Sequence, residues 1–190
     1  RTHTTGPDGK VVESLSYTPQ GRPATRTDAA GAVTKFGYDK DGNRTITIDA
    51  LGHETKDEFD ARGNRLKSTD ALGNTWSYEY DKGSRLVRTV APDGQETERR
   101  VYNKEGRLIT VIDAAGNSTH TEYDTFGRVT ARTDALDRTT RYSYDVTKGA
   151  VGCQACNASS MPTLITLPSG RKIQRAYDAD KHLTAETIAF

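Results

Sequence analysis

An aromatic residue recurs along this chain at a nearly constant interval. Successive members lie 21, 21, 21, 22, 21, 21 and 33 residues apart, at Tyr17, Tyr38, Phe59, Tyr80, Tyr102, Tyr123, Tyr144 and Tyr177. A fixed period of this length indicates one small structural unit repeated in series. We therefore expect an array of similar units, which offers a long surface and not a single pocket built from distant loops.

A second anchor keeps step with the first. It lies 14 residues after each aromatic anchor except the last, and it is glycine in all copies but one, where Asp137 replaces it: Gly31, Gly52, Gly73, Gly94, Gly116 and, after the longer final interval, Gly170. Two turn motifs surround these anchors, Tyr-Asp-x-x-Gly and Asp-Ala-x-Gly. Both favour tight turns, because aspartate accepts hydrogen bonds from nearby backbone amides and glycine adopts positive φ without strain.

The residues that follow each glycine alternate in character. Trp76, Tyr78 and Tyr80 stand three, five and seven residues after Gly73, and polar side chains occupy the positions between them. A period of two places alternate side chains on opposite faces of a β-strand. One face is therefore predicted to be aromatic and rich in threonine, and the other polar and charged.

Each unit is predicted to be a pair of antiparallel strands with two tight turns. The expected fold class is all-β, with tandem units of about 21 residues forming a continuous, curved or spiralling β-sheet. We place tandem repeats at 1–145, a loop insertion at 146–162 and a further repeat at 163–190. Two copies carry an extra residue between glycine and tyrosine, so we expect β-bulges within Lys10–Ser16 and within Gln95–Val101.

Composition restricts the classes of protein that fit. Only 33% of the 190 residues are hydrophobic and the mean hydropathy is −0.77, so the chain is too polar to form a thick hydrophobic core. Its aromatic and β-branched residues recur too regularly for a disordered chain. The net charge of +1 argues against a nucleic-acid-binding surface, and no apolar run is long enough to span a membrane. The chain begins in mid-pattern without an initiator methionine, so we expect a piece of a longer protein.

The recurring aromatic residues are best explained as structural, because cross-strand stacking between neighbouring units stabilises a sheet. The alternative is that Trp76, Tyr78 and Tyr80 form a platform that stacks on sugars or bases.

Aspartates and arginines also recur. The aspartates that open one turn are predicted to cap it and not to bind calcium, since calcium needs several oxygen ligands around one ion: Asp28, Asp49, Asp70, Asp113 and Asp134. The arginines that follow the other turn are predicted to pair with turn aspartates of adjacent units, with polyanion binding as the alternative: Arg22, Arg44, Arg65, Arg85, Arg107 and Arg128.

The insertion holds the only two cysteines, Cys153 and Cys156, in a Cys-x-x-Cys pair. We favour a surface loop with a local disulfide or two free thiols. A zinc site completed elsewhere in a longer chain and a redox dithiol are the alternatives. No catalytic motif is present in the sequence, so we expect neither enzymatic activity nor a cofactor.

The repeated unit closely resembles the Rhs/YD repeat. Its clearest copies run from Asn103-Lys104-Glu105-Gly106-Arg107-Leu108 to Tyr123-Asp124, and from Tyr123 to Tyr144-Asp145. The departures are Phe59 for tyrosine, Asn103 for aspartate, and Ser84 and Asp137 at glycine positions.

This resemblance implies a β-ribbon that spirals into a hollow shell, as in bacterial Rhs polymorphic toxins, the C component of insecticidal toxin complexes and teneurins. In the bacterial members the shell encloses a toxic C-terminal domain until delivery. The implied partners are the remainder of a longer chain and a secretion apparatus or chaperone, with export or delivery to the cell surface. The core-end cleavage motif of the family is absent, so no protease or toxin activity is expected. The alternative is a carbohydrate- or receptor-binding module at a cell surface.

Overall fold

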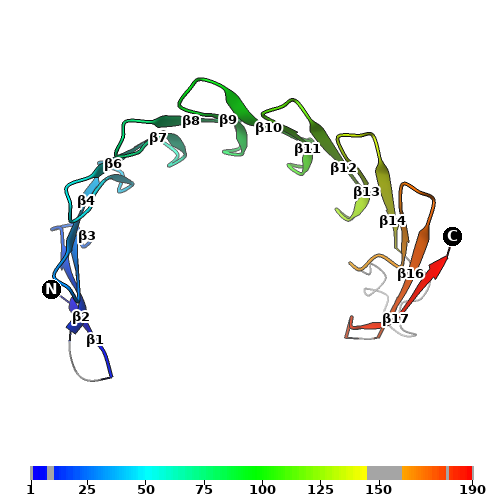
Figure 1. Cartoon of the computed structure of the whole chain (residues 1–190), viewed down its shortest axis with the longest axis horizontal. Coiled ribbons are helices and arrows are strands. Elements are labelled where there is room, and N and C mark those ends of the chain that lie inside the picture. Colours follow the sequence, from blue (N-terminus) through cyan, green and yellow to red (C-terminus); the bar gives the residue numbers. More distant parts are fainter. Residues whose placement is uncertain (1, 8–10, 145–159, 179, 190) are drawn as a thin grey trace. The chain divides into compact units, whose positions relative to one another are not determined.

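The part of the chain that the structure describes is built of strands. In this computed structural model the described residues are 2–7, 11–144, 160–178 and 180–189. They hold 17 β-strands and no helix (Figure 1), so no described segment forms an apolar helix long enough to cross a membrane. The all-β prediction is confirmed.

The chain divides into two compact units, Arg1–Thr97 and Glu98–Phe190. Strands of the first unit are β1 (Thr2–Thr5), β2 (Val11–Tyr17), β3 (Pro23–Asp28), β4 (Val33–Tyr38), β5 (Arg44–Ile48), β6 (Glu54–Phe59), β7 (Arg65–Thr69), β8 (Thr75–Tyr80) and β9 (Leu86–Val90). The remaining strands are β10 (Glu96–Tyr102), β11 (Leu108–Asp113), β12 (Ser118–Tyr123), β13 (Val129–Thr133), β14 (Thr139–Ser143), β15 (Leu164–Thr166), β16 (Lys172–Tyr177) and β17 (Leu183–Ala189).

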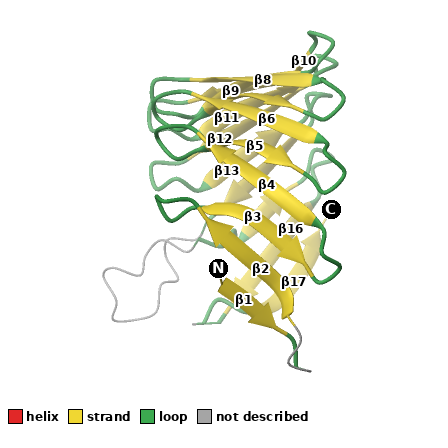
Figure 2. Ribbon diagram, turned by 90° about the vertical axis from the view of Figure 1, so that its left-hand side faces the viewer, coloured by secondary structure: helices red, strands yellow, loops and turns green. Residues whose placement is uncertain are grey.

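Within each unit the strands form an antiparallel meander. Each strand pairs with the next one in the chain, from β1 to β9 in the first unit and from β10 to β17 in the second. Figure 2 shows strands β3 to β6 lying side by side, with the turns at their two ends. The predicted unit of two antiparallel strands and two turns is therefore confirmed.

Both kinds of turn share one backbone geometry. In the turn after β4, the amide of Asp39 donates to the carbonyl of Asn43 over 3.0 Å, and the amide of Gly42 donates to the carbonyl of Asp39 over 3.2 Å. This pattern is a three-residue hairpin loop in which the third residue adopts a left-handed conformation. Gly42 supplies it with φ of 97°, and Asp137 supplies it in the turn after β13 with φ of 58°.

A β-bulge opposite the aromatic anchor recurs in both units, and the sequence did not indicate it. Tyr38 pairs with Arg44 while Gly37 pairs with Ile46, so Thr45 is the extra residue. The same register shift occurs opposite Tyr17, Phe59, Tyr80, Tyr102, Tyr123 and Tyr177. Because two residues face one, the strand bends and twists more strongly at this point.

One of the two bulges predicted from the longer copies is confirmed. Thr4 pairs with Glu13 and Thr5 with Val11, which leaves Val12 as the extra residue inside the predicted span. The other bulge, within Gln95–Val101, stays a prediction.

The sheet has almost no core in the described residues. Only Ala131 and Ile165 are buried, at 1% and 8% exposure. A sheet ordinarily gains stability by covering one face with a second layer. Here the stabilising contacts are cross-strand pairs and turns, which each contribute little and must recur to add up.

The left-handed turn position provides a test of this geometry. A Cβ atom at Gly73 would meet no atom within 4 Å, so a substitution there causes no steric clash with neighbouring residues. Its effect on stability comes from the backbone strain of a non-glycine residue at φ of 87°. We expect Gly73→Ala to lower the free energy of unfolding by about 1–2 kcal/mol. Asp137 occupies the matching place in the same Asp-Ala-Leu-x turn, so Asp137→Gly is the reciprocal variant and should not destabilise. Chemical denaturation measures both changes, and a loss in both variants would contradict the assignment.

Candidate functional site

The predicted aromatic face exists. Phe36 of β4 pairs with Thr47 of β5, which pairs with Thr55 of β6, so these side chains lie on one face. Tyr38 lies on the same face because it is two residues from Phe36. We call this side of the sheet, which carries the residues three, five and seven positions after each glycine anchor, the aromatic face.

The tyrosine anchors join consecutive copies through their hydroxyl groups. Four of them donate to the backbone carbonyl of the residue 15 positions earlier: Tyr38 to Pro23 (2.8 Å), Tyr123 to Leu108 (2.9 Å), Tyr144 to Val129 (2.7 Å) and Tyr177 to Pro162 (3.2 Å). Tyr17 instead lies 2.9 Å from the hydroxyl of Thr2.

The position of the accepting carbonyl explains why this bond recurs. Pro23 pairs with Tyr17 on one side, whereas on the other side the pairing between β3 and β4 stops at Thr25, two residues short of Pro23. The backbone pairing between β3 and β4 has ended at this point, and the Tyr38 hydroxyl donates to the Pro23 carbonyl beyond it. Since Pro23 is the partner of the preceding anchor, the bond links each anchor to the one before it.

Arginines lie over several anchor rings. The guanidinium carbon lies 5.7 Å from the ring centre for Arg22 over Tyr38, 5.8 Å for Arg107 over Tyr123 and 4.4 Å for Arg128 over Tyr144. In each pair the arginine follows one aromatic anchor and contacts the next, so it adds a second link between copies. Such contacts contribute about 0.5–1 kcal/mol at exposed sites.

The predicted pairing of these arginines with aspartates of adjacent units is wrong for two of them. Arg85 binds Asp81 at 2.6 Å and Arg128 binds Asp124 at 2.7 Å, and both pairs lie within one turn. The physical reason is proximity, because the turn brings residues four positions apart together before any neighbouring copy is reached. Polyanion binding by the row of arginines stays untested.

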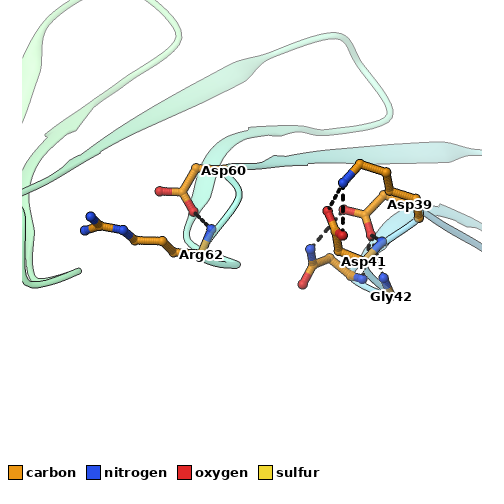
Figure 3. Close-up of polar contacts among 7 residues, drawn as sticks. Asp39, Asp41, Gly42, Asp60 and Arg62 are labelled. Atoms are coloured by element: carbon orange, nitrogen blue, oxygen red, sulfur yellow. Dashed lines mark hydrogen bonds and ion pairs between the residues drawn. The ribbon is translucent and has the colours of Figure 1, made fainter.

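The aspartates that were predicted to cap their turns do so, since Oδ1 of each accepts backbone amides of its own turn: Asp28, Asp49, Asp70, Asp113 and Asp134. The aspartates of the other kind of turn bond in the same way. Figure 3 shows Asp39, whose Oδ1 accepts the amides of Asp41 (3.0 Å), Gly42 (2.7 Å) and Asn43 (2.9 Å). Its Oδ2 accepts the Asn43 side-chain amide at 2.9 Å. In the next turn Asp60 accepts the amide of Arg62 at 2.8 Å. Each carboxylate thus fixes its turn through backbone donors.

These hydrogen bonds lower the pKa of the turn carboxyl groups. A side-chain bond from an asparagine four residues later is the largest cause for the pKa of Asp39, Asp60, Asp70 and Asp113. A bond from an arginine at the same spacing is the largest cause for the pKa of Asp81 and Asp134. Hydrogen bonds that favour the charged form lower the pKa of a carboxyl group, so these bonds favour the charged form of the turn aspartates.

Metal binding receives no support from the described residues. No group of three or more His, Cys, Asp or Glu side chains converges there in a way that would hold an ion. The aspartates considered for calcium, such as Asp49 and Asp70, bind amides of their own turns. Cys153 and Cys156, the candidate zinc ligands, lie outside the described residues.

The structure brings the possible stacking platform together on β8. Trp76 pairs with Ser68 and Tyr78 with Thr89, which places both rings on the aromatic face with Tyr80. Trp76 is 37% exposed, and the guanidinium of Arg65 lies 4.9 Å from the centre of the Tyr78 ring. The arrangement suits a structural cluster, and it also leaves one indole accessible.

The hydroxyl bond of the anchors can be tested with reciprocal variants. We expect Tyr123→Phe to lower the free energy of unfolding by about 0.5–1.5 kcal/mol, because the Leu108 carbonyl loses its donor. Phe59 lacks a hydroxyl, and the residue 15 positions earlier is Arg44, two residues beyond the point where the β5–β6 pairing stops at Ile46. Phe59→Tyr should therefore leave stability unchanged or raise it. Thermal unfolding of both variants tests this prediction. A loss of stability in Phe59→Tyr would contradict the proposed hydrogen bond between an anchor hydroxyl and the carbonyl 15 residues earlier.

Comparison with known proteins gives consistent matches. The family model described as RHS Repeat matches residues 17–54, 59–96, 102–139 and 123–148, which together cover more than half of the chain. The Probable deoxyribonuclease RhsB of Dickeya dadantii is 32% identical over 97 residues, 51% of this chain and 6% of that protein. The Double-stranded DNA deaminase toxin A of Burkholderia cenocepacia is 32% identical over 78 residues, 41% of this chain and 5% of that protein.

Solved structures share the fold. A chain in the crystal structure of TcdB2-TccC3-Cdc42 superposes with a TM-score of 0.59 at 18% identity, over 93% of this chain and 9% of that chain. A chain of the Photorhabdus luminescens Tc holotoxin pore gives 0.55 at 18% identity, over the same shares. The protein thus spans less than a tenth of the length of these relatives and structures.

Proposed function

Because the chain belongs to the RHS repeat family, we propose that it forms part of the wall of a toxin shell. In this proposal a longer chain folds its repeats around a C-terminal effector domain and shields the producing cell from it until delivery. The observation that carries the proposal is the link between copies. Tyrosine hydroxyls, arginine–ring contacts and sequential pairing join copies to one another, while almost no side chain of the described residues is buried.

Such a ribbon is suited to enclosing space. A single layer with two exposed faces needs few residues to cover a given area, and a bend that recurs at most of the anchors accumulates curvature. In Figure 1 the strands of the first unit follow one another along a curve. Closing a ribbon on itself also protects strand edges that would otherwise pair with other chains.

The proposed role is structural and not enzymatic. The names deoxyribonuclease and deaminase toxin describe whole relatives, of which the matched part is 6% and 5%. We assign the repeats at 1–145 and 163–190 to the wall, whereas most of the predicted insertion at 146–162 lies outside the described residues. The proposed partners are the rest of the longer chain and a chaperone or secretion apparatus, with export from a bacterial cell.

Limited proteolysis of the longer protein tests this function. The C-terminal domain should resist protease while the repeats are folded, and it should be digested at denaturant concentrations that unfold them. The same domain expressed alone serves as the matched control and should be digested in native buffer. Equal digestion rates for the free and the attached domain would exclude encapsulation.

A receptor- or glycan-binding module is the second candidate, and the accessible indole of Trp76 is the observation that favours it. Retention on a glycan array should then fall in Trp76→Ala and Arg65→Ala. Absence of retention by the unchanged protein would remove this candidate.

A further inference from the structure

An open hollow lies on the second unit, where the strands that carry Val129 and lead to its partner, the Tyr144 anchor, meet a neighbouring turn. Strands β12, β13 and β14 and the turn after β15 form it, and its lining includes Thr119, Arg132, Arg138, Thr140, Tyr142 and Ser169. Thr140 pairs with Arg132, and Tyr142 follows two residues later, so the hollow opens on the aromatic face.

One positive charge in this hollow is not neutralised by the described residues. Arg138 binds Asp134 at 2.8 Å. The other oxygen of Asp134 accepts the amides of Leu136 at 3.0 Å and Arg138 at 3.1 Å. Asp134 is therefore fully engaged in its own turn. Arg132 is exposed and forms no ion pair or side-chain hydrogen bond within the described part of the chain.

The repeat does not require an arginine at this place. The residues nine positions after the other aromatic anchors of the regular copies are Arg26, Thr47, Ser68, Thr89 and Val111. Arg26 is the only other charged member, and Glu13 forms an ion pair with it. Arg26 pairs with Thr34 just as Arg132 pairs with Thr140, so the two arginines have the same register and differ in whether an acid neutralises them.

The rest of the lining supplies hydroxyl groups and an aromatic ring. No side-chain hydrogen bond engages Thr119, Thr140 or Tyr142 among the described residues. A site of this kind, with one cation, several hydroxyls and a ring, matches a ligand that has a carboxylate, hydroxyl groups and an apolar face.

We propose that this hollow binds a carboxylate-bearing sugar. Arg132 receives the carboxylate in a charge-assisted hydrogen bond, the hydroxyls of Thr119 and Thr140 bond to sugar hydroxyls, and the Tyr142 ring contacts the apolar face of the sugar ring. This site does not depend on the shell role, so either proposal stands if the other fails.

Calorimetric titration of the 190-residue chain with methyl glucuronide and methyl glucoside tests the site. The glucuronide should bind at least about tenfold more tightly, because only it offers a charged acceptor to Arg132. Arg132→Gln should reduce glucuronide affinity by about tenfold or more with an unchanged melting temperature. Arg26→Gln is the matched control at the same register position in the other unit, and it should keep the full affinity.

Three results would overturn the proposal. One is equal binding of the glucuronide to Arg132→Gln and to the unchanged protein. Another is an equal loss in Arg26→Gln, which would indicate nonspecific charge. The third is acetate binding as tightly as the glucuronide, which would show that the hollow attracts anions without recognising the sugar.

Discussion

Replacing Tyr144 with alanine is expected to lower the free energy of unfolding by about 2–4 kcal/mol, the largest effect of any anchor substitution considered. Three contacts are lost together. The hydroxyl donates to the Val129 carbonyl at 2.7 Å, Arg128 lies 4.4 Å from the ring centre, and burial of the phenol is sufficient to raise its pKa. Equilibrium unfolding in urea measures the change.

Two matched variants separate these contributions. Tyr144→Phe removes only the hydroxyl and should cost about 0.5–1.5 kcal/mol. Tyr17→Ala removes an anchor that is 42% exposed and whose hydroxyl bonds, within the described residues, only to that of Thr2, so its effect should be clearly smaller than that of Tyr144→Ala. Equal losses at Tyr17 and Tyr144 would show that the contacts between copies do not stabilise the sheet.

Acid should destabilise this protein progressively below about pH 4, because so many of its turns depend on charged aspartate. The pKa is lowered in the folded state for eight of these carboxyl groups: Asp39, Asp49, Asp60, Asp70, Asp81, Asp113, Asp124 and Asp134. A group with a lowered pKa contributes stability above the unfolded-state pKa of about 3.9, and this contribution disappears as the pH falls through the folded-state pKa.

The melting temperature measured by circular dichroism at constant ionic strength should thus be flat from pH 7 to pH 5 and then fall steeply toward pH 2. Asp70→Asn retains an oxygen acceptor for the Leu72 and Asn74 amides but removes one titrating group, so its melting temperature should fall less steeply. A melting temperature that is independent of pH down to pH 2 would contradict the role of the charged turns.

The repeat, its strands and its turns were predictable because their causes are local. Alternation around Trp76, Tyr78 and Tyr80 determines which face each ring occupies, and the Asp-Ala-x-Gly spacing matches one turn geometry. The bond from four of the tyrosine anchors to the carbonyl 15 residues earlier was not predictable. It depends on where the pairing between two strands stops, as at Thr25 two residues from Pro23, and no residue type in the sequence marks that point.

The arginines show a second limit of sequence reasoning. Arg128 was expected to reach an adjacent copy through an aspartate, but it reaches that copy through the Tyr144 ring and holds Asp124 of its own turn. Charge patterns do not distinguish these partners, because both lie within reach of a long side chain. The hollow beside Arg132 was missed for a related reason, since only the register shows that no acid lies opposite this arginine.

Electron cryo-microscopy of the longer protein is the most direct test of the central claim that these repeats are wall material. We predict a closed chamber in which residues corresponding to β2–β14 form part of the wall, with density for the C-terminal domain inside. An open ribbon, or a C-terminal domain located outside the repeats, would contradict it.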